Sequence, residues 1–171
     1  LAGANKLWSF PAMKMIHALI PALILSVSAG AVSAKVIASA TRAANFTYTV
    51  SPTPVPLDSA GATSLSFNVN KAGTYVLTYS AECSADNGAA TNSGWVEIDI
   101  EVNGVVVAPT VGSADSFCSP DNVAGSSGWV RPSITVPVTF VAGVNTVRIL
   151  GKLFSPVITG WLGDTSLVIH Q

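Results

Sequence analysis

Charge and histidine are scarce in this sequence. Charged side chains make up 10% of its 171 residues, compared with roughly 25% in an average globular protein. The formal net charge is −1, and the chain has no basic cluster of the kind that binds nucleic acid. The two histidines, His17 and His170, lie near opposite ends of the chain. A histidine-based metal cluster or a Ser-His-Asp triad is therefore not expected.

Cysteine is equally scarce. The two cysteines, Cys83 and Cys118, belong to no C-x-x-C motif and have no histidine near them in sequence, so neither redox nor thiol-nucleophile chemistry is indicated. If the chain is exported, an oxidising compartment makes a Cys83–Cys118 disulfide the natural pairing. Two unpaired, buried thiols are the alternative.

The N-terminal segment has the pattern of an export signal. Lys14 follows Met13, and the apolar stretch 18–27 carries no charge. About ten apolar residues suit the h-region of a signal peptide and are too few for a membrane span of ~20. The small residues at 32–34 predict cleavage after Ala34, with retention as an anchor helix as the alternative. We therefore divide the chain into upstream sequence read from too early a start (1–12), a signal helix (13–34) and a secreted or periplasmic domain (35–171).

Helical periodicity is absent after residue 44, and alternation of apolar and polar residues is common. Such alternation predicts strands that bury one face. Asn103-Gly104 is a strong signal for a type I′ hairpin between two of them. The predicted strands are centred on 46–50, 65–69, 75–83, 96–102, 105–107, 134–140, 144–150 and 162–169. This pattern predicts an all-β domain, an antiparallel jelly-roll sandwich of about 8–10 strands.

Every tryptophan of the predicted domain follows a glycine. Trp95, Trp129 and Trp161 are each the middle residue of a Gly-Trp-Val or Gly-Trp-Leu tripeptide. A large aromatic residue after a flexible one can seal the edge of a sandwich, or it can offer a flat apolar face on which sugar rings stack. Both interpretations stay open, and the three tryptophans are the candidate ligand-binding residues.

Several segments of the domain resemble those of known jelly rolls. AGTYVLTYSAEC (72–83), IDIEVNGVVV (98–107), TVPVTFVAGVNTVRI (135–149) and DTSLVIH (164–170) are similar to segments of C1q/TNF-like domains. AGTY (72–75) and AGVNTV (142–147) are also similar to segments of jelly-roll carbohydrate-binding modules. The chain has no collagen-like Gly-X-Y stem. Either resemblance implies a jelly roll with a non-enzymatic binding or assembly role, and neither identifies a ligand.

The segment EIDIE (97–101) carries a second, local resemblance. It is similar to the catalytic strand of the lichenase- and laminarinase-type β-glucanases, which are also jelly rolls. That resemblance implies that Glu97 is the nucleophile, Asp99 assists and Glu101 is the acid/base. The family's downstream substrate-binding segments have no counterpart here.

Spacing along a strand favours a structural role for these acids. Glu97 and Glu101 would lie roughly 13 Å apart along a straight strand, whereas the two carboxyl groups of a retaining glycosidase are about 5–5.5 Å apart. No basic residue lies near them in sequence. We therefore expect Glu97, Asp99 and Glu101 to line the solvent face of a strand whose other face, from Val96 to Val102, is core.

The sequence favours a secreted, non-catalytic domain that binds an extracellular ligand, with a glycan as the first candidate. One alternative is a structural subunit that joins copies of itself by strand addition through the segment 35–50. The other is a compact β-glucanase that uses the three acids. No nucleic-acid partner is expected, and no membrane contact is expected after signal cleavage. Calcium is a candidate cofactor because oxygen-bearing side chains lie in predicted loops, the candidate ligands being Asp86, Asp115, Asp121 and Asp164.

Overall fold

The structure, a computed structural model, describes residues 34–88, 94–108, 116–120 and 128–171. The segment 1–12 and nearly all of the predicted signal helix lie outside these residues. Within the described part of the chain, no helix is long and apolar enough to cross a membrane.

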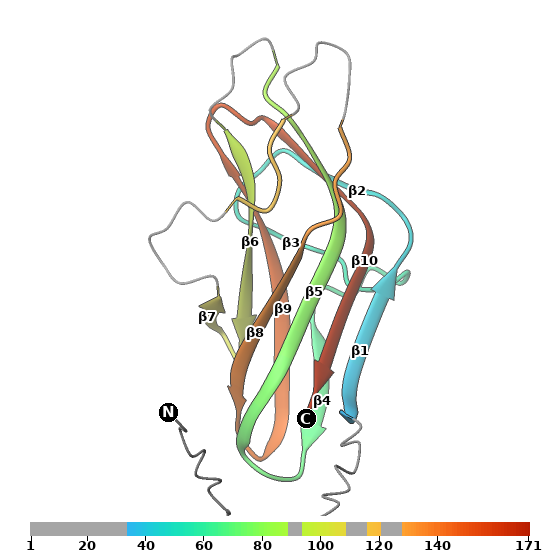
Figure 1. Ribbon diagram of the computed structural model, residues 1–171, viewed down its shortest axis with the longest axis vertical. Coiled ribbons are helices and arrows are strands. Elements are labelled where there is room, and N and C mark those ends of the chain that lie inside the picture. Colours follow the sequence, from blue (N-terminus) through green and yellow to red (C-terminus); the bar gives the residue numbers. More distant parts are fainter. Residues whose placement is uncertain (1–33, 89–93, 109–115, 121–127) are drawn as a thin grey trace, which may run out of the picture. The chain divides into compact units, whose positions relative to one another are not determined.

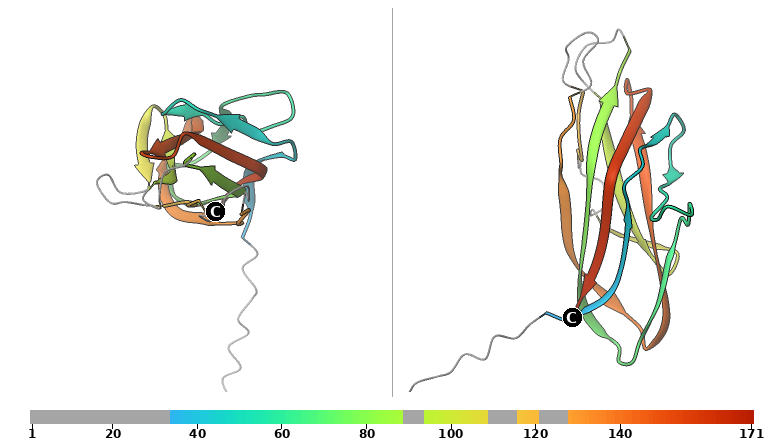
Figure 2. Two further views of the ribbon diagram at one scale, coloured as in Figure 1. Left: turned by 90° about the horizontal axis from the view of Figure 1, so that it is seen from above. Right: turned by 90° about the vertical axis from the view of Figure 1, so that its right-hand side faces the viewer.

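Ten β-strands make up the regular structure of the described residues, and they form two antiparallel sheets. Sheet A contains β1 (Val36–Arg42), β2 (Phe46–Tyr48), β5 (Gly73–Asp86), β8 (Ser133–Phe140) and β10 (Thr159–His170). Sheet B contains β3 (Thr53–Pro54), β4 (Leu65–Val69), β6 (Trp95–Val102), β7 (Val105–Ala108) and β9 (Gly143–Phe154). Figure 1 shows β8, β5, β10 and β1 side by side in front of β6 and β9, and the side view in Figure 2 shows the same two layers.

The strand pairs are nested along the chain. β6 pairs with β7, β5 with β8, β9 with β3 and β4, and β10 with β1 and β2. A long hairpin of nested antiparallel pairs that winds into two facing sheets is the jelly-roll arrangement. The predicted all-β antiparallel sandwich is therefore confirmed.

Apolar alternation places the core between the sheets. In β5, Tyr75, Leu77 and Tyr79 are buried, whereas the residues between them are more exposed.

The predicted hairpin after β6 is also confirmed. Asn103 has a φ of 50° and Gly104 a φ of 86°, and a type I′ turn requires positive φ at both central residues.

Tyr48 connects the two sheets through two glycines. Its ring packs against Gly151 of β9 in sheet B and against Gly160 of β10 in sheet A. A Cβ at either glycine would lie 2.7 Å from a ring carbon of Tyr48, which is well inside normal contact distance. Glycine is therefore required at both positions so that this buried ring can fill the space between the sheets.

The N-terminal part of the domain differs from the prediction. The first predicted strand, 46–50, ends at Tyr48 in β2, and Val50 is exposed. The segment expected to extend towards a neighbouring copy instead forms β1, which pairs with β10 of the same chain. Donation of β1 to a neighbour stays a prediction, and it would require β1 to leave β10.

The predicted disulfide is confirmed. Cys83 and Cys118 are bonded, with their Cα atoms 6.0 Å apart. Cys83 lies in β5 of sheet A, while Cys118 pairs with Val96 of β6 in sheet B through an isolated bridge. The bond therefore ties the two sheets together at one end of the sandwich.

Candidate ligand-binding surface

Trp161 lies on the outer face of sheet A. Its neighbours in β10, Gly160 and Leu162, are buried, so alternation turns its own side chain outward. Its partners across the sheet are Ser84 in β5 and Thr47 in β2. The tryptophan is half-buried and remains accessible on this face.

Trp129 lies on the same face, just before β8. Cys83 and Val130 exchange two backbone hydrogen bonds, of 2.8 and 3.0 Å. Extending this antiparallel register by one residue places Trp129 opposite Ser84. Cys83 is buried, so alternation turns Ser84 outward and, by the same register, places Trp129 on that face, although the intervening Val130 is itself 50% exposed. Trp129 is 41% exposed.

The two tryptophans flank Ser84. Trp161 is its cross-strand partner, and the extended Cys83–Val130 register places Trp129 on its other side. Side chains in such pairs are about 4.5–5.5 Å apart at Cβ. Ser84 is only 1% exposed although it lies on the outer face. Its hydroxyl has no hydrogen-bond partner among the described residues. The row Trp161–Ser84–Trp129 therefore presents two large aromatic side chains with a small residue covered between them.

Trp95 lies elsewhere. It belongs to β6, on the outer face of sheet B, and its ring stacks on Phe154 with centroids 4.7 Å apart and planes 12° apart. Trp95 therefore cannot share one ligand surface with the other two, and ligand binding by the tryptophans stays a prediction. Two of them share a face, and the third lies on the opposite sheet.

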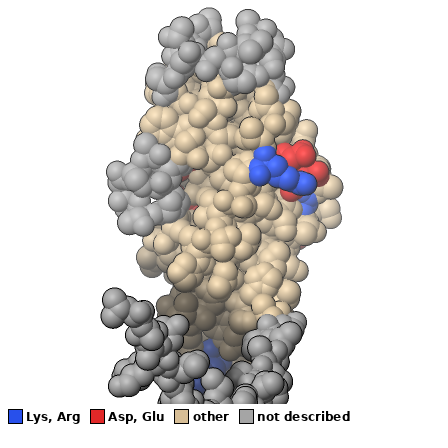
Figure 3. Space-filling model, in the orientation of Figure 1, with Lys and Arg blue, Asp and Glu red and all other residues tan. Residues whose placement is uncertain are grey.

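A polar cluster lies beside the tryptophan row. Glu82 is paired with Gly163 in β10, and the register of Val130 with Cys83 places Arg131 on its other side. The guanidinium of Arg131 is 3.5 Å from the carboxylate of Asp164, and both side chains are largely exposed. Figure 3 shows this face, where charged residues of both signs gather in one cluster amid largely uncharged surface. The cluster offers hydrogen-bond donors and acceptors next to the aromatic rings.

Sequence reasoning did not select Ser84, Glu82 or Arg131 as site residues. Their proximity depends on how β5 pairs with β10 on one side and with residues 130–140 on the other. No local pattern in the sequence specifies this register.

The acidic segment of β6 is not a solvent face. The side chains alternate as predicted, with Val96, Ile98 and Ile100 fully buried in the core. However, Glu97 is only 6% exposed and Asp99 only 5%. The prediction that these acids line a solvent-exposed face is therefore wrong. They lie on the outer face of sheet B, where their side chains are largely covered.

Cations on β9 make this burial tolerable. The ammonium of Lys152 lies 2.7 Å from the carboxylate of Asp99 and 3.1 Å from that of Glu97. Arg148 lies 3.2 Å from Glu101. No basic residue lies near these acids in sequence, but both cations, about 50 residues away, meet them across the β6–β9 ladder.

These contacts set the protonation of the cluster. Burial raises the pKa of Glu97 above its ordinary value, although Lys152 opposes this rise and Asp99 adds to it. The hydrogen bond to Asp99 raises the pKa of Lys152, which keeps the lysine charged. All three acids that the β-glucanase resemblance names therefore form ion pairs. Glu97 pairs with Lys152, whereas Glu101 pairs with Arg148.

Glu97→Gln is expected to flatten the pH dependence of stability. Because the pKa of Glu97 is higher in the folded than in the unfolded protein, the folded state retains this proton to higher pH. Protonation of Glu97 therefore stabilises the folded state at low pH. This contribution to the free energy of unfolding declines as pH rises from the ordinary pKa of about 4.5 to the raised pKa of the folded state. Urea unfolding from pH 4 to 8 measures this decline. An unchanged profile in Glu97→Gln would contradict the assignment.

The candidate calcium ligands do not converge in the described residues. Asp86 accepts a hydrogen bond of 2.8 Å from the backbone of Gly88, while Asp164 pairs with Arg131. The register partner of Asp86 is Thr159, five residues from Asp164 along β10 and thus about 16 Å away. Asp115 and Asp121 lie outside the described residues. The described part contains no group of three or more acids, histidines or cysteines arranged for a metal, and calcium binding stays a prediction.

Comparisons with known proteins identify no family. No protein-family model matches the chain, and no curated protein matches it. Among solved structures, the crystal structure of dimeric latent PorU from Porphyromonas gingivalis is similar, with a TM-score of 0.40 and 17% sequence identity. The match covers 63% of this chain and 10% of that chain. A similarity of this extent identifies no function.

Proposed function

We propose that the domain is a secreted, non-catalytic module that binds a glycan on the outer face of sheet A. The observation that carries this proposal is the row Trp161–Ser84–Trp129. Two accessible tryptophans on one face of a rigid sheet offer flat apolar area at a low cost in side-chain entropy. Support also comes from the signal-like N-terminus and from the jelly-roll fold.

The spacing of the two tryptophans suits an extended ligand. Trp161 lies on β10 and Trp129 just before β8, on either side of β5. Neighbouring strands are about 4.8 Å apart, so the two backbones are about 10 Å apart. Each ring can stack on the apolar face of a different sugar unit. The neighbouring side chains of Glu82, Arg131 and Asp164 can then hydrogen-bond to hydroxyl groups of the same ligand.

The β-glucanase alternative has less support. Its three acids carry ion pairs, and they lie on sheet B rather than on the face with the two tryptophans. In a retaining glycosidase, the carboxyl groups of the general acid and the nucleophile must lie close together to act on the same glycosidic bond. Glu97 and Glu101 are four residues apart on one strand. A substrate would have to displace Lys152 and Arg148 before it met the carboxylates.

Trp129→Ala and Trp161→Ala are each expected to weaken glycan binding about tenfold. Each change removes one stacking platform, and a loss of about 1.4 kcal/mol corresponds to a factor of ten in Kd. A glycan array first identifies the ligand for the domain 35–171, and calorimetric titration then gives the Kd of each variant. Trp95→Ala is the matched control because it removes the same ring from the other sheet, so its Kd should stay at the wild-type value.

Two results would overturn the proposal. One is an array on which the folded domain binds no glycan. The other is an equal loss of affinity in Trp95→Ala and in the two sheet A variants. Near-ultraviolet circular dichroism and the melting temperature establish that each variant is folded before its Kd is compared.

A further inference from the structure

The end of the sandwich opposite the tryptophan row contains a polar hollow. Its volume is about 310 Å³, and it lies between the start of β1, the end of β4 and the turn into β5. Trp161 and His170 are nine residues apart along β10, so the hollow is about 30 Å from the proposed glycan surface. Its main lining residues are Lys35, Ile37, Asn70, Lys71, Tyr75 and Gln171.

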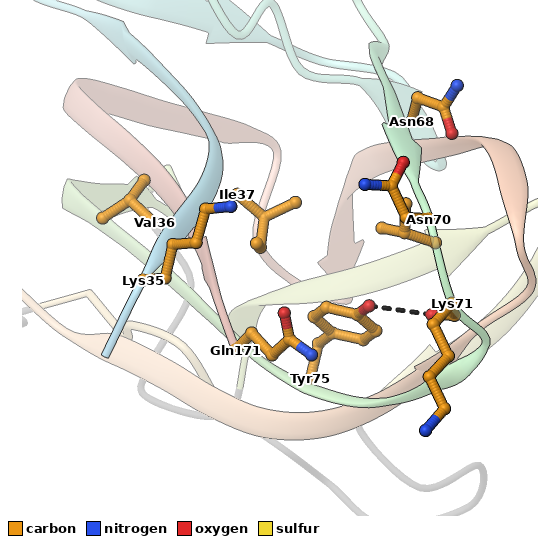
Figure 4. Close-up of a pocket in the computed structure, with 9 residues that line it drawn as sticks. Lys35, Val36, Ile37, Asn68, Asn70, Lys71, Tyr75 and Gln171 are labelled. Carbon is orange, nitrogen blue, oxygen red and sulfur yellow. Dashed lines mark hydrogen bonds between the residues drawn. The ribbon is translucent and has the colours of Figure 1, made fainter. Parts of the chain in front are cut away.

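The hollow has an apolar floor and a polar rim. Tyr75 is buried and donates a hydrogen bond of 2.9 Å to the carbonyl of Lys71, while Ile37 is half-buried beside it. Lys35, Asn70 and Gln171 are exposed at the rim. In Figure 4, the ammonium of Lys35 and the amide of Asn70 point towards one another across the hollow. An apolar floor with convergent polar groups is typical of small-ligand sites.

Charge is distributed unevenly over this protein. Arg131, Arg148 and Lys152 are each within 4 Å of a carboxylate. Among the described residues, no ion pair involves Lys35 or Lys71, and no acidic side chain lines the hollow. Two unpaired lysines at one hollow, in a chain with so few charges, create a local positive potential that attracts anions.

We propose that this hollow binds a small acidic ligand of about monosaccharide size, such as a uronic acid. The carboxylate of the ligand contacts Lys35, whose ammonium points into the hollow, and the flexible side chain of Lys71, which points away in Figure 4, turns towards the ligand on binding. The carboxamides of Asn70 and Gln171 donate and accept hydrogen bonds with the hydroxyl groups. The buried edge of Tyr75 and the side chain of Ile37 support the apolar face of the sugar ring.

Signal cleavage would complete this site. The backbone nitrogen of Lys35 is 3.3 Å from the carbonyl oxygen of Gln171, so a chain that begins at Lys35 has its α-ammonium at the hollow. The cleaved protein is therefore expected to bind the acidic ligand more tightly than a chain that retains residues before Lys35.

The experiment titrates the domain 35–171 with glucuronate, glucose and inorganic sulfate, and it follows backbone amide shifts by NMR. We expect glucuronate to shift the amides of Asn70, Lys71 and Gln171 and to bind at least tenfold more tightly than either glucose or sulfate. Raising the NaCl concentration from about 50 to 500 mM should weaken this binding because the Debye length shrinks. Lys35→Gln with Lys71→Gln should lower the affinity at least tenfold, while Lys35→Arg with Lys71→Arg keeps the charge and should retain binding.

Three results would overturn the proposal. The first is the absence of shifts around the hollow at about 10 mM glucuronate, a concentration that would populate even a weak site. The second is equal affinity for glucose and glucuronate, which would show that the lysines do not select the charge. The third is unchanged affinity in the folded Lys→Gln double variant.

Discussion

Lys152→Ala should lower the free energy of unfolding by about 3 kcal/mol at neutral pH. Removal of one partner from a buried ion pair costs about 3–5 kcal/mol because it leaves a buried charge without compensation. Here Lys152 is the cation for both Glu97 and Asp99. Its own side chain is 32% exposed, so we expect the low end of that range. Urea unfolding at pH 7 measures the loss.

Two comparisons make this prediction specific. Arg148→Ala removes the other cation of the ladder, but its side chain is 38% exposed and that of Glu101 is 14% exposed. That loss should be only about 0.5–1 kcal/mol. In Lys152→Ala the deficit should also shrink at acidic pH, where a protonated Glu97 needs no cation. Equal losses in the two alanine variants at pH 7 would contradict the assignment of Lys152 as the cation of a buried cluster.

Loss of the Cys83–Cys118 disulfide should also destabilise the domain strongly. The bond joins residues 35 apart in sequence, and closing a loop of this length contributes about 3–4 kcal/mol in the chain-entropy description. The double substitution to alanine should lower the free energy of unfolding by about that amount. Because Cys83 pairs with Val130, local order around Trp129 should fall as well, visible as a red shift of tryptophan fluorescence.

Reduction provides an independent check on this value. Dithiothreitol should destabilise the wild-type protein to nearly the same extent and should have little effect on the double variant. A double variant within about 1 kcal/mol of the oxidised wild type would show that the bond contributes little to stability. The melting temperature of the reduced wild type, measured beside that of the double variant, separates the covalent link from the packing of the two sulfur atoms.

Local sequence patterns were sufficient to predict most of the strands. Alternation in β5, β6 and β8 is a property of neighbouring residues, because successive side chains of a strand point to opposite faces. The turn at Asn103-Gly104 was predictable for a similar reason, since positive φ at both positions is accessible to this pair. The strand β1 was not predicted as part of its own sheet, because VIASATR has weak alternation and its partner, β10, lies at the far end of the chain.

The functional residues were less predictable than the strands. Alternation correctly placed Glu97 and Asp99 opposite the core residues of β6, but it could not show whether their own face was covered. Lys152 stabilises them from β9, 55 residues away in the case of Glu97. Sequence proximity thus gave no sign of the cation that makes burial of these acids tolerable.

The sequence by itself determined the all-β class, the alternation of core and surface along each strand, the central hairpin and the only available disulfide pairing. Each of these follows from nearest-neighbour stereochemistry or from the count of cysteines. Only the tertiary structure decided that Trp129 and Trp161 share a face while Trp95 lies on the other sheet. It alone brought the ends of β1, β4 and β10 together around the hollow beside Lys35. The physical reason is that these contacts depend on strand register and sheet order, which arise from pairing between segments far apart in the chain.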